Sequence, residues 1–401
     1  MKLLFLSNEQ PWPPKSGAVL RNYHLIVGLA RQHAVTLVTL VKPTAARDDS
    51  IDSPYNVCEG VVEVSQSSCI ASTTARYNET AEARDRLRAL VSSRSPRSIR
   101  RWSSAELIDK LRGLRATTNF DAVMASRAYM GEMALQAGFD RVLVDLPDLE
   151  SVAMRRLLAQ GAWYKSKPID WGEWVKLHRY ESRLTQRFWR VSVCKEQDRM
   201  FFGGGPRDNV RLIPNGTEEF PPTRQEDEVQ GEMLFVGLLS YVPNIDAVRH
   251  FHDDVLPIIR RALPAARFRI VGFRPDLEVS ALDNGVDCFV NASVDDLAPF
   301  YARASLAVVP MRLGSGTKLK VLEGLAHGKA VVSTSFGAEG FDVRPGIDLE
   351  IADTPDAFAA TCARLLSDPV ARRRLGESGR ARVLERHRWD VVVRTASAAL
   401  S

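Results

Sequence analysis

Residues 308–334 read VVPMRLGSGTKLKVLEGLAHGKAVVST, and the interpretation of the whole chain starts from this stretch. Its first residues are apolar and β-branched, which predicts a buried strand, and a glycine-rich loop follows. The apolar spacing from Thr317 to His327 predicts a helix that ends at Gly328, and KAVVST predicts a further strand. A strand, a glycine-rich loop, a helix and a strand in this order are typical of a doubly wound α/β domain.

The sequence on both sides of this stretch shows the same alternation. In the second half, residues 244–261 and 295–304 predict helices, and strands are predicted at 232–237, 267–272, 286–290 and 305–310. In the first half, strands are predicted at 2–7, 34–40, 60–64, 122–125, 142–145, 191–193 and 210–214. Alternating strands and helices indicate parallel sheets with helices on both faces.

Residues 215–231, NGTEEFPPTRQEDEVQG, combine a proline pair with an acidic run and lack apolar periodicity, so we predict a linker there. The fold class is therefore α/β, with two doubly wound, Rossmann-like domains facing each other across a cleft. The first domain is expected at residues 1–214 and the second at 232–387. Ligands of such sheets bind at the carboxyl ends of the strands, which draws attention to the loops after Ser7, Gly237, Gly272 and Pro310.

Composition excludes several protein classes. The chain has 401 residues, 45% of them hydrophobic and 26% charged, which are ordinary values for globular proteins and exclude wholesale disorder. No apolar run approaches the roughly 18 residues of a membrane span, and the apolar run at the amino terminus is too short for a signal peptide, so a cytoplasmic location is expected. The five cysteines form no CxxC pair, and we interpret them as reduced and without a metal-binding role.

The glycine-rich loop has the features of a phosphate-binding site. Gly314 and Gly316 allow close approach of the backbone, and the N–H groups of Thr317, Lys318 and Leu319 are expected to open the helix. Unpaired N–H groups at a helix start bind phosphate. Cationic side chains come from Arg312, Lys318 and Lys320, whose charge-assisted hydrogen bonds contribute about 1.5–3 kcal/mol each.

Glu323 follows one turn later and is positioned to accept hydrogen bonds from ribose hydroxyls. Donors for an anion followed by a carboxylate fit a nucleoside diphosphate with its sugar attached. A plain surface ion pair between Lys320 and Glu323 in a common βα turn is the alternative explanation. The stretch lacks GxxxxGK[ST], which argues against a nucleotide-hydrolysing P-loop.

At this point the chain resembles a known family, the GT-B glycosyltransferases, and within them glycosyltransferase family 4 (group 1) and its exosortase-associated exopolysaccharide sugar transferases. The resemblance covers most of the chain. It is carried by PWPPKSG at 11–17, VDLPDLES at 144–151, IPNG at 213–216, FVGLLSYVPNIDAV at 235–248, RIVG at 269–272 and the stretch at 308–334.

The resemblance implies transfer of a sugar from a nucleoside-diphosphate sugar to a glycan or lipid-linked acceptor, with retention at the anomeric carbon. It implies that Glu323 holds the donor ribose, that Gly316 and Thr317 lie beside the diphosphate, and that Gly17 lets the amino-terminal loop close. Many family members have a glutamate where this chain has Ser315, which shifts contacts with the donor sugar to Ser315, Arg312 or the backbone. The residues 388–401 are expected to pack back on the first domain, as in the family.

Catalysis requires stabilisation of the leaving diphosphate, which Arg312 and Lys320 would supply. With these cations present no metal ion or cofactor is expected, and no nucleic-acid partner. Asp145 and Asp148 are candidates for an acid or base on the acceptor side, although a structural or helix-capping role suits each of them as well. The donor site is expected to comprise Gly17, Gly237, Gly272, Ser315, Gly316, Thr317, Lys318, Leu319 and Glu323.

Basic and aromatic residues gather at 94–102 and 163–174, in a combination that suits the inner membrane surface and a lipid-linked acceptor. A solvated arginine face with core tryptophans explains them equally well. Two other functions stay open: a nucleotide-sugar epimerase of the same two-domain architecture, and an inactive nucleotide-sugar binding protein. Formation of a sugar–acceptor product would exclude both.

Overall fold

The computed structural model describes residues 1–14, 17–42, 53–69, 95–160, 167–203, 209–221, 223, 225–294, 296–314 and 316–401. The chain divides into two compact units: unit 1 is Met1–Pro214 with Val392–Ser401, and unit 2 is Asn215–Val391. Residues 215–231, predicted as a linker, fall within unit 2. The reason is visible at Glu228, whose carboxylate accepts hydrogen bonds from Lys329 at 3.0 Å and from Arg372 at 2.9 Å.

Unit 1 is built on a seven-stranded, fully parallel sheet. The strand order is β3-β2-β1-β4-β5-β6-β7, with bounds β1 (Lys2–Ser7), β2 (Ala34–Val41), β3 (Gly60–Ser65), β4 (Ala122–Ser126), β5 (Val142–Leu146), β6 (Arg190–Val193) and β7 (Val210–Leu212). The central strands are buried along almost their entire length because helices cover both faces of the sheet. Their continuous apolar runs are what made them recognisable in the sequence.

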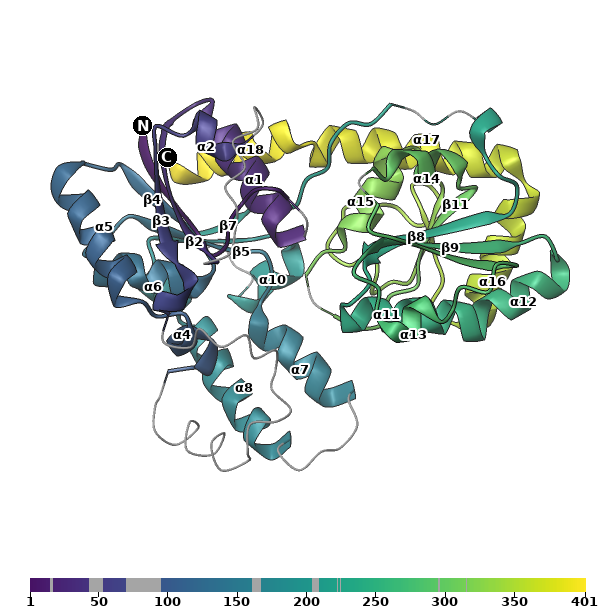
Figure 1. Cartoon of the computed structure of the whole chain (residues 1–401), viewed down its shortest axis with the longest axis horizontal. Helices are drawn as coiled ribbons and strands as arrows, with labels where there is room; N and C mark the ends of the chain where they lie inside the picture. The colour runs from purple at the N-terminus through teal and green to yellow at the C-terminus, as the bar shows by residue number, and fades with distance from the viewer. Residues whose placement is uncertain are drawn as a thin grey trace. The chain divides into compact units, whose positions relative to one another are not determined.

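Helices connect the strands of unit 1 (Figure 1). They are α1 (Gly17–Ala30), α2 (Pro54–Val57), α4 (Arg97–Arg101), α5 (Ala105–Thr117), α6 (Ala128–Gln136), α7 (Glu150–Gln160), α8 (Lys167–Glu181), α9 (Leu184–Arg187), α10 (Glu196–Phe201) and the 3₁₀ turn η1 (Gln66–Ser68). Among them α7 and α8 extend away from the sheet and pack against each other. The last helix of the chain, α18 (Trp389–Leu400), lies beside α1. A Cβ on Gly28 would be 2.3 Å from a methyl group of Val393, so α1 and α18 pack closely there.

Unit 2 contains a six-stranded parallel sheet in the order β10-β9-β8-β11-β12-β13. Its strands are β8 (Glu232–Leu238), β9 (Arg267–Phe273), β10 (Cys288–Ala292), β11 (Leu306–Val309), β12 (Val331–Ser333) and β13 (Glu350–Ile351). The strand order reverses between β8 and β11, and the corresponding reversal in unit 1 lies between β1 and β4. The doubly wound α/β class predicted from the sequence is confirmed, and the reversals mark where such sheets bind ligands.

The helices of unit 2 surround this sheet (Figure 1). They are α11 (Val242–His250), the π-helical turn η3 (Phe251–Val255), α12 (Leu256–Ala262), α13 (Leu277–Ser280), α14 (Ala298–Arg303), α15 (Leu319–Ala326), α16 (Pro355–Ser367), α17 (Pro369–His387) and the 3₁₀ turn η2 (Gln225–Asp227). The core joins the helices to the strands through aromatic contacts, for example between Phe251 of η3 and Phe268 of β9, whose ring centroids are 4.4 Å apart. The rigid sheet thus supports the loop between β11 and α15.

Candidate active site

The loop between β11 and α15 lies at the reversal of strand order in unit 2. Its two described glycines have positive φ angles, 114° at Gly314 and 66° at Gly316, which side chains other than glycine rarely adopt. A Cβ on Gly314 would lie 3.5 Å from Pro243 in the first turn of α11. The glycines therefore shape the loop, as the sequence indicated. Ser315 lies outside the described residues, and its contact with the donor sugar stays a prediction.

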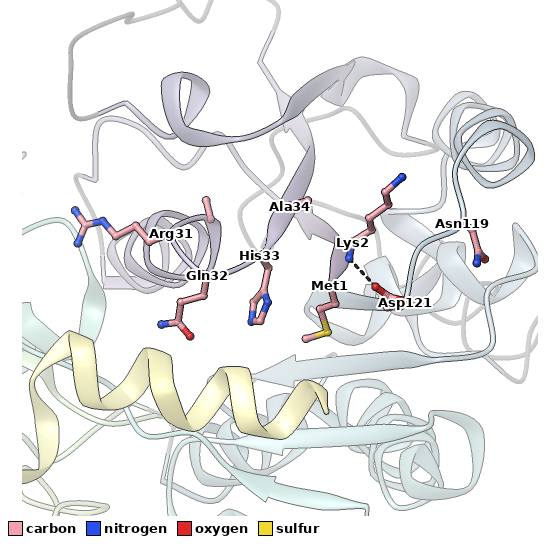
Figure 2. A pocket seen from close by; sticks show the side chains of 9 residues that line it. Met1, Lys2, Arg31, Gln32, His33, Ala34, Asn119 and Asp121 are labelled. Carbon is pink, nitrogen blue, oxygen red and sulfur yellow. Dashed lines mark hydrogen bonds between the residues drawn. The ribbon is translucent and has the colours of Figure 1, made fainter.

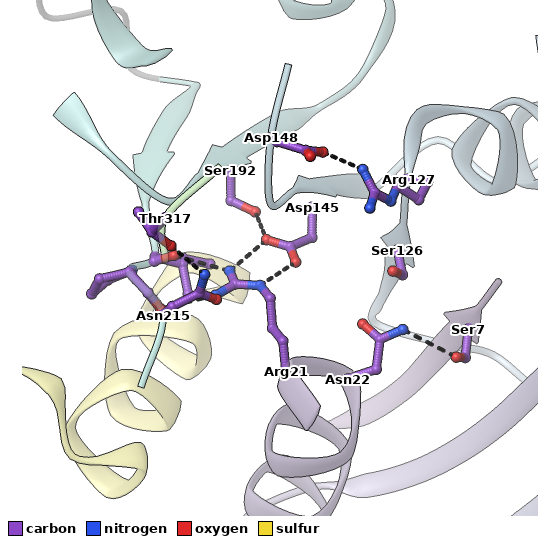
Figure 3. Close-up of polar contacts among 12 residues, drawn as sticks. Ser7, Arg21, Asn22, Ser126, Arg127, Asp145, Asp148, Ser192, Asn215 and Thr317 are labelled. Atoms are coloured by element: carbon purple, nitrogen blue, oxygen red, sulfur yellow. Dashed lines mark hydrogen bonds and ion pairs between the residues drawn. The ribbon is translucent and has the colours of Figure 1, made fainter. Parts of the chain in front are cut away.

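The helix after this loop begins two residues later than the sequence predicted. Lys318 is the N-cap with φ −93° and ψ 95°, an extended conformation, and Leu319 is the first helical residue. The first helical N–H groups are thus those of Leu319 and Lys320, while Thr317 stays in the loop. The Thr317 hydroxyl accepts a 2.5 Å hydrogen bond from Nδ2 of Asn215 (Figure 3). Thr317 is thereby tied to the IPNG segment.

Lys318 folds back on the loop that precedes it. Its ammonium donates a 2.9 Å hydrogen bond to the carbonyl oxygen of Gly316 and lies 3.9 Å from the centroid of the Phe336 ring. A buried lysine in this position closes the turn by binding its own backbone. We infer that Lys318 shapes the loop, and its predicted contact with a donor phosphate stays a prediction.

Lys320 points into the space beneath Gly237. Its Nζ atom donates to Oδ1 of Asn244 at 2.8 Å and lies 3.8 Å from the centroid of the Phe235 ring. Burial lowers the pKa of Lys320 to about 7, although the nearby Glu323 carboxylate acts in the opposite direction. A half-desolvated cation at the start of a helix is well suited to bind an anion, because the ligand's charge restores favourable solvation of the ammonium.

Arg312 already has an anionic partner. Its guanidinium binds Asp246 of α11 through two hydrogen bonds of 2.7 and 3.1 Å, and Nη1 lies 3.2 Å from Nδ1 of His250. The Arg312 side chain is half exposed. An anionic ligand would have to share this arginine with Asp246, so Arg312 is a weaker candidate for the leaving group than Lys320.

Glu323 lies one turn into α15, where the sequence placed it. Burial raises the pKa of its carboxyl, whereas Lys320 and Tyr301 act in the opposite direction. The Tyr301 hydroxyl donates a long hydrogen bond, 3.5 Å, to Oε2. The carboxylate therefore keeps accepting capacity for a ligand hydroxyl.

Gly237 and Gly272 face each other across β8 and β9. A Cβ on Gly272 would lie 1.7 Å from the carbonyl oxygen of Gly237, and a Cβ on Gly237 would lie 2.8 Å from Nδ2 of Asn244 and 3.1 Å from Nζ of Lys320. Packing thus explains both glycines. Gly237 in addition leaves the room that Lys320 and Asn244 occupy.

In unit 1, Asp145 forms a buried ion pair with Arg21, which favours the structural role that the sequence left open, and its role as an acid or base stays a prediction. Oδ2 accepts from Nε of Arg21 at 2.8 Å, and Oδ1 accepts from Nη2 of Arg21 at 2.9 Å and from Oγ of Ser192 at 2.6 Å (Figure 3). Arg21 also donates to the carbonyl oxygens of Ile213 and Pro214. Both carboxylate oxygens are engaged, and the exposed fraction of Asp145 is 1%.

Asp148 is held by Arg127, which follows β4 (Figure 3). Arg127 has φ 78° and ψ 148°, a combination that is strained for a residue with a side chain. Burial disfavours the charge of Arg127, but Asp148 and Glu150 outweigh this effect and raise its pKa. The pair sits at the carboxyl ends of β4 and β5 and stays partly exposed, so Asp148 remains available for the acceptor-side role as a prediction.

Several residues of these clusters escaped the sequence reasoning. Asn244 lies in the quoted FVGLLSYVPNIDAV segment and Asn215 in IPNG, yet nothing in their spacing indicated a partner around 76 or 102 positions away. Tyr301 and Arg127 carried no pattern at all. Gly17, predicted at the donor site, is the exposed first residue of α1, and its part in loop closure stays a prediction.

Two of the tryptophans considered for a membrane surface, Trp171 and Trp174, are partly buried in unit 1. The Trp171 and Trp174 rings meet edge to face with centroids 5.4 Å apart, against a core of Met154, Leu158 and Leu177. Nε1 of Trp174 donates to the carbonyl oxygen of Ser151. These contacts favour the core explanation for Trp171 and Trp174, while Trp163 and Tyr164 lie outside the described residues.

A shallow pocket lies at the amino-terminal ends of β1 and β2 in the unit 1 sheet (Figure 2). It is lined by Met1, Lys2, Arg31, His33 and Asp121 among others. Because ligands of doubly wound sheets bind at the carboxyl ends, it is a poor candidate for the site. Over the described ranges no group of three His, Cys, Asp or Glu side chains could hold a metal ion. The helices in those ranges are too short or too polar to span a membrane.

Comparison with known proteins agrees with this geometry. Residues 230–368 match the family model described as glycosyl transferases group 1. The MMP alpha-(1->4)-mannosyltransferase of Mycolicibacterium hassiacum is 35% identical over 254 residues, which are 59% of this chain and 59% of that protein. The curated relatives that the chain matches are thus covered over only about a third to three-fifths of their own length.

Solved structures are similar over nearly the whole chain. Sucrose-phosphate synthase of Thermosynechococcus elongatus has a TM-score of 0.71 at 16% identity, and the alignment covers 99% of this chain and 98% of the synthase chain. Anabaena HepE, in complex with UDP, has a TM-score of 0.66 at 12% identity and covers 100% and 99%. The chain therefore has the GT-B fold, and its residues 230–368 match the group 1 glycosyltransferases.

Proposed function

We propose that this protein is a glycosyltransferase that moves a sugar from a nucleoside-diphosphate sugar to a glycan or lipid-linked acceptor. The observation that carries the proposal is the position of Lys320, a partly desolvated cation beneath Gly237 at the start of α15, where the strand order of unit 2 reverses. The match of residues 230–368 to group 1 glycosyltransferases and the 35% identity with a mannosyltransferase support it.

The chemistry follows from where charge develops. Breaking the bond between the anomeric carbon and the diphosphate leaves negative charge on the leaving phosphate, and preorganised donors that face this charge lower the barrier. Lys320 and the helix start of α15 would supply these donors, and Arg312 would add to them once Asp246 yields to the ligand. Glu323 would accept hydrogen bonds from the ribose. In this proposal transfer needs no metal ion or cofactor.

We further propose that the reaction retains the anomeric configuration and that the protein serves in exopolysaccharide biosynthesis as a family 4 enzyme. Contact with the inner membrane surface would bring it to a lipid-linked acceptor, and the basic residues Arg97, Arg100 and Arg101 of α4 are the described candidates for that contact. Sedimentation with anionic vesicles would measure it, and reversal of these charges should abolish it.

Calorimetry with UDP, GDP and ADP tests the donor site. We expect one of them to bind and Glu323→Ala to weaken binding through lost ribose contacts. In a steady-state assay of sugar transfer, Lys320→Ala should lower turnover by losing the diphosphate contact. Hydrogen bonds to charged groups contribute about 1.5–3 kcal/mol, or about 10- to 100-fold in affinity or rate. Glu377→Ala, which removes an exposed carboxylate from α17, is the matched control.

Product analysis separates the competing functions. With a labelled donor, transfer gives a sugar–acceptor product and free nucleoside diphosphate, whereas an epimerase gives an isomerised sugar and no acceptor product. Binding without turnover of any donor would favour a nucleotide-sugar binding protein. Wild-type affinity in Glu323→Ala, or an unchanged rate in Lys320→Ala, would remove those residues from their roles.

A further inference from the structure

Asn244 lies in the first turn of α11, on the chain that follows β8, and is buried. Both the nitrogen and the oxygen of its side-chain amide form hydrogen bonds. Nδ2 donates to the carbonyl oxygen of Leu238 at 2.8 Å, and Oδ1 accepts from Nζ of Lys320 at 2.8 Å. Because a carbonyl needs a donor and an ammonium needs an acceptor, only one orientation of the amide satisfies both partners.

The other neighbours of Nζ of Lys320 are weaker partners for its ammonium. Nζ lies 3.8 Å from the Phe235 ring centroid on β8 and 3.7 Å from Sδ of Met311, a weak acceptor. On its own helix Glu323 attracts the charge and Lys318, the N-cap, repels it. Among the described residues, Oδ1 of Asn244 is the oxygen that accepts a hydrogen bond from this ammonium.

The contrast with the neighbouring cation is informative. Arg312 is bound by a carboxylate, Asp246, two residues further along α11. A carboxylate cancels much of the charge it binds, whereas a neutral amide orients the ammonium and leaves its positive charge for another anion. The same turn of α11 therefore holds Arg312 with the charged carboxylate of Asp246 and Lys320 with the neutral amide of Asn244.

We propose that Asn244 is a positioning residue, which directs the Lys320 ammonium toward a ligand phosphate and favours its protonated form without neutralising it. The proposal rests on the donor-site function proposed above. Asn244 acts through Lys320 and touches no reacting atom. Gly237 completes the arrangement, since a Cβ there would lie 2.8 Å from Nδ2 of Asn244.

The proposal makes opposite predictions for two variants. Asn244→Ala removes the acceptor and should lower the pKa of Lys320 from about 7 by about 1 or more. Asn244→Asp places a negative charge on the ammonium and should raise that pKa by about 1–3. Both should weaken binding of a nucleoside diphosphate, the first by loss of the ammonium and the second by neutralising it.

The matched control is Asn291→Ala. Oδ1 of Asn291 accepts a 2.7 Å hydrogen bond from Arg269 of β9, so this change also breaks an asparagine–cation contact in unit 2. It should alter neither the pKa of Lys320 nor nucleotide affinity.

Two measurements test the inference. The pKa of Lys320 in the free protein comes from the pH dependence of acetic anhydride labelling, read by mass spectrometry for each variant. Calorimetry with UDP, GDP and ADP between pH 6 and 8.5 gives the affinity. For Asn244→Ala we expect about tenfold weaker binding at pH 7.5 that recovers toward the wild-type value at pH 6, where Lys320 is protonated again.

The outcomes separate the two levels of the argument. An unchanged labelling profile in both Asn244 variants overturns the inference, and so does a loss of affinity in Asn244→Ala that is the same at pH 6 and pH 7.5, since that loss would be structural. If the wild-type protein binds none of the three nucleotides, the proposed function fails, while the labelling experiment still decides whether Asn244 controls Lys320.

Discussion

Replacing Asp145 with asparagine should destabilise unit 1 without removing a catalytic group. The carboxylate accepts two hydrogen bonds from Arg21 and one from Ser192, and the exposed fractions of the Arg21 and Asp145 side chains are 1% and 2%. Burial disfavours the Arg21 charge, but Asp145 outweighs this effect and raises the pKa of Arg21. Arg21 therefore stays charged in Asp145→Asn, without an anion, and an amide NH₂ faces one of its donors.

Removing one partner of a buried ion pair costs about 3–5 kcal/mol. In a unit of roughly 200 residues each kcal/mol changes the melting temperature by about 2–4 °C, so we expect a decrease on the order of 10 °C. Thermal denaturation followed by circular dichroism measures the change. The double variant Arg21→Met with Asp145→Leu removes both charges and should recover part of the loss.

The refuting result is specific. If Asp145→Asn keeps wild-type stability and loses transfer activity, then Asp145 acts in the chemistry and its assignment to the structural pair is wrong. If the double variant is as unstable as Asp145→Asn alone, the uncompensated charge of Arg21 is not the cause.

Three further predictions concern other parts of the fold. Gly113→Ala should stabilise the protein by about 0.5–1 kcal/mol, because an alanine Cβ in the middle of α5 would meet no atom within 4 Å and alanine favours a helix; a loss of stability in urea denaturation would contradict this. Lys320 has a pKa near 7 in the free protein, and a bound nucleoside diphosphate should raise this pKa. Binding above pH 7 should therefore take up a proton, and the affinity should fall as the pH rises. Calorimetry in two buffers of different ionisation enthalpy measures the proton uptake, and an equal binding heat in both buffers would argue against it. His327 is stacked between Phe220 and Tyr301, and burial lowers its pKa to about 4. Between pH 6.5 and 4 the unfolded state therefore binds one proton more than the folded state, and the free energy of unfolding should fall by about 3 kcal/mol. The variant His327→Phe should flatten this pH dependence, and an unchanged pH dependence would exclude His327 as its cause.

The sequence predicted the elements whose signal is local. Strands such as β5 and β11 are buried on both faces, so they read as continuous apolar runs. Gly314 and Gly316 indicated a glycine-rich loop after the strand, and the structure places a loop there with positive φ at both. Glu323 could be placed one turn into its helix because helical spacing is fixed. The sequence was therefore sufficient for the α/β class and for the position of the glycine-rich loop, whose binding of phosphate stays a prediction.

The tertiary structure alone decided which polar side chains meet. From the sequence Asp145 was open to a catalytic or a structural role, and the structure shows that both of its oxygens accept hydrogen bonds from Arg21, 124 residues away. Likewise, the contact that orients Lys320 comes from Asn244 on a different helix, and the extended backbone of Lys318 moved the helix start to Leu319. Such pairings join segments that are distant in the sequence and come together only in the folded protein. Apolar periodicity, by contrast, is a property of consecutive residues, so it can be recognised from the sequence alone.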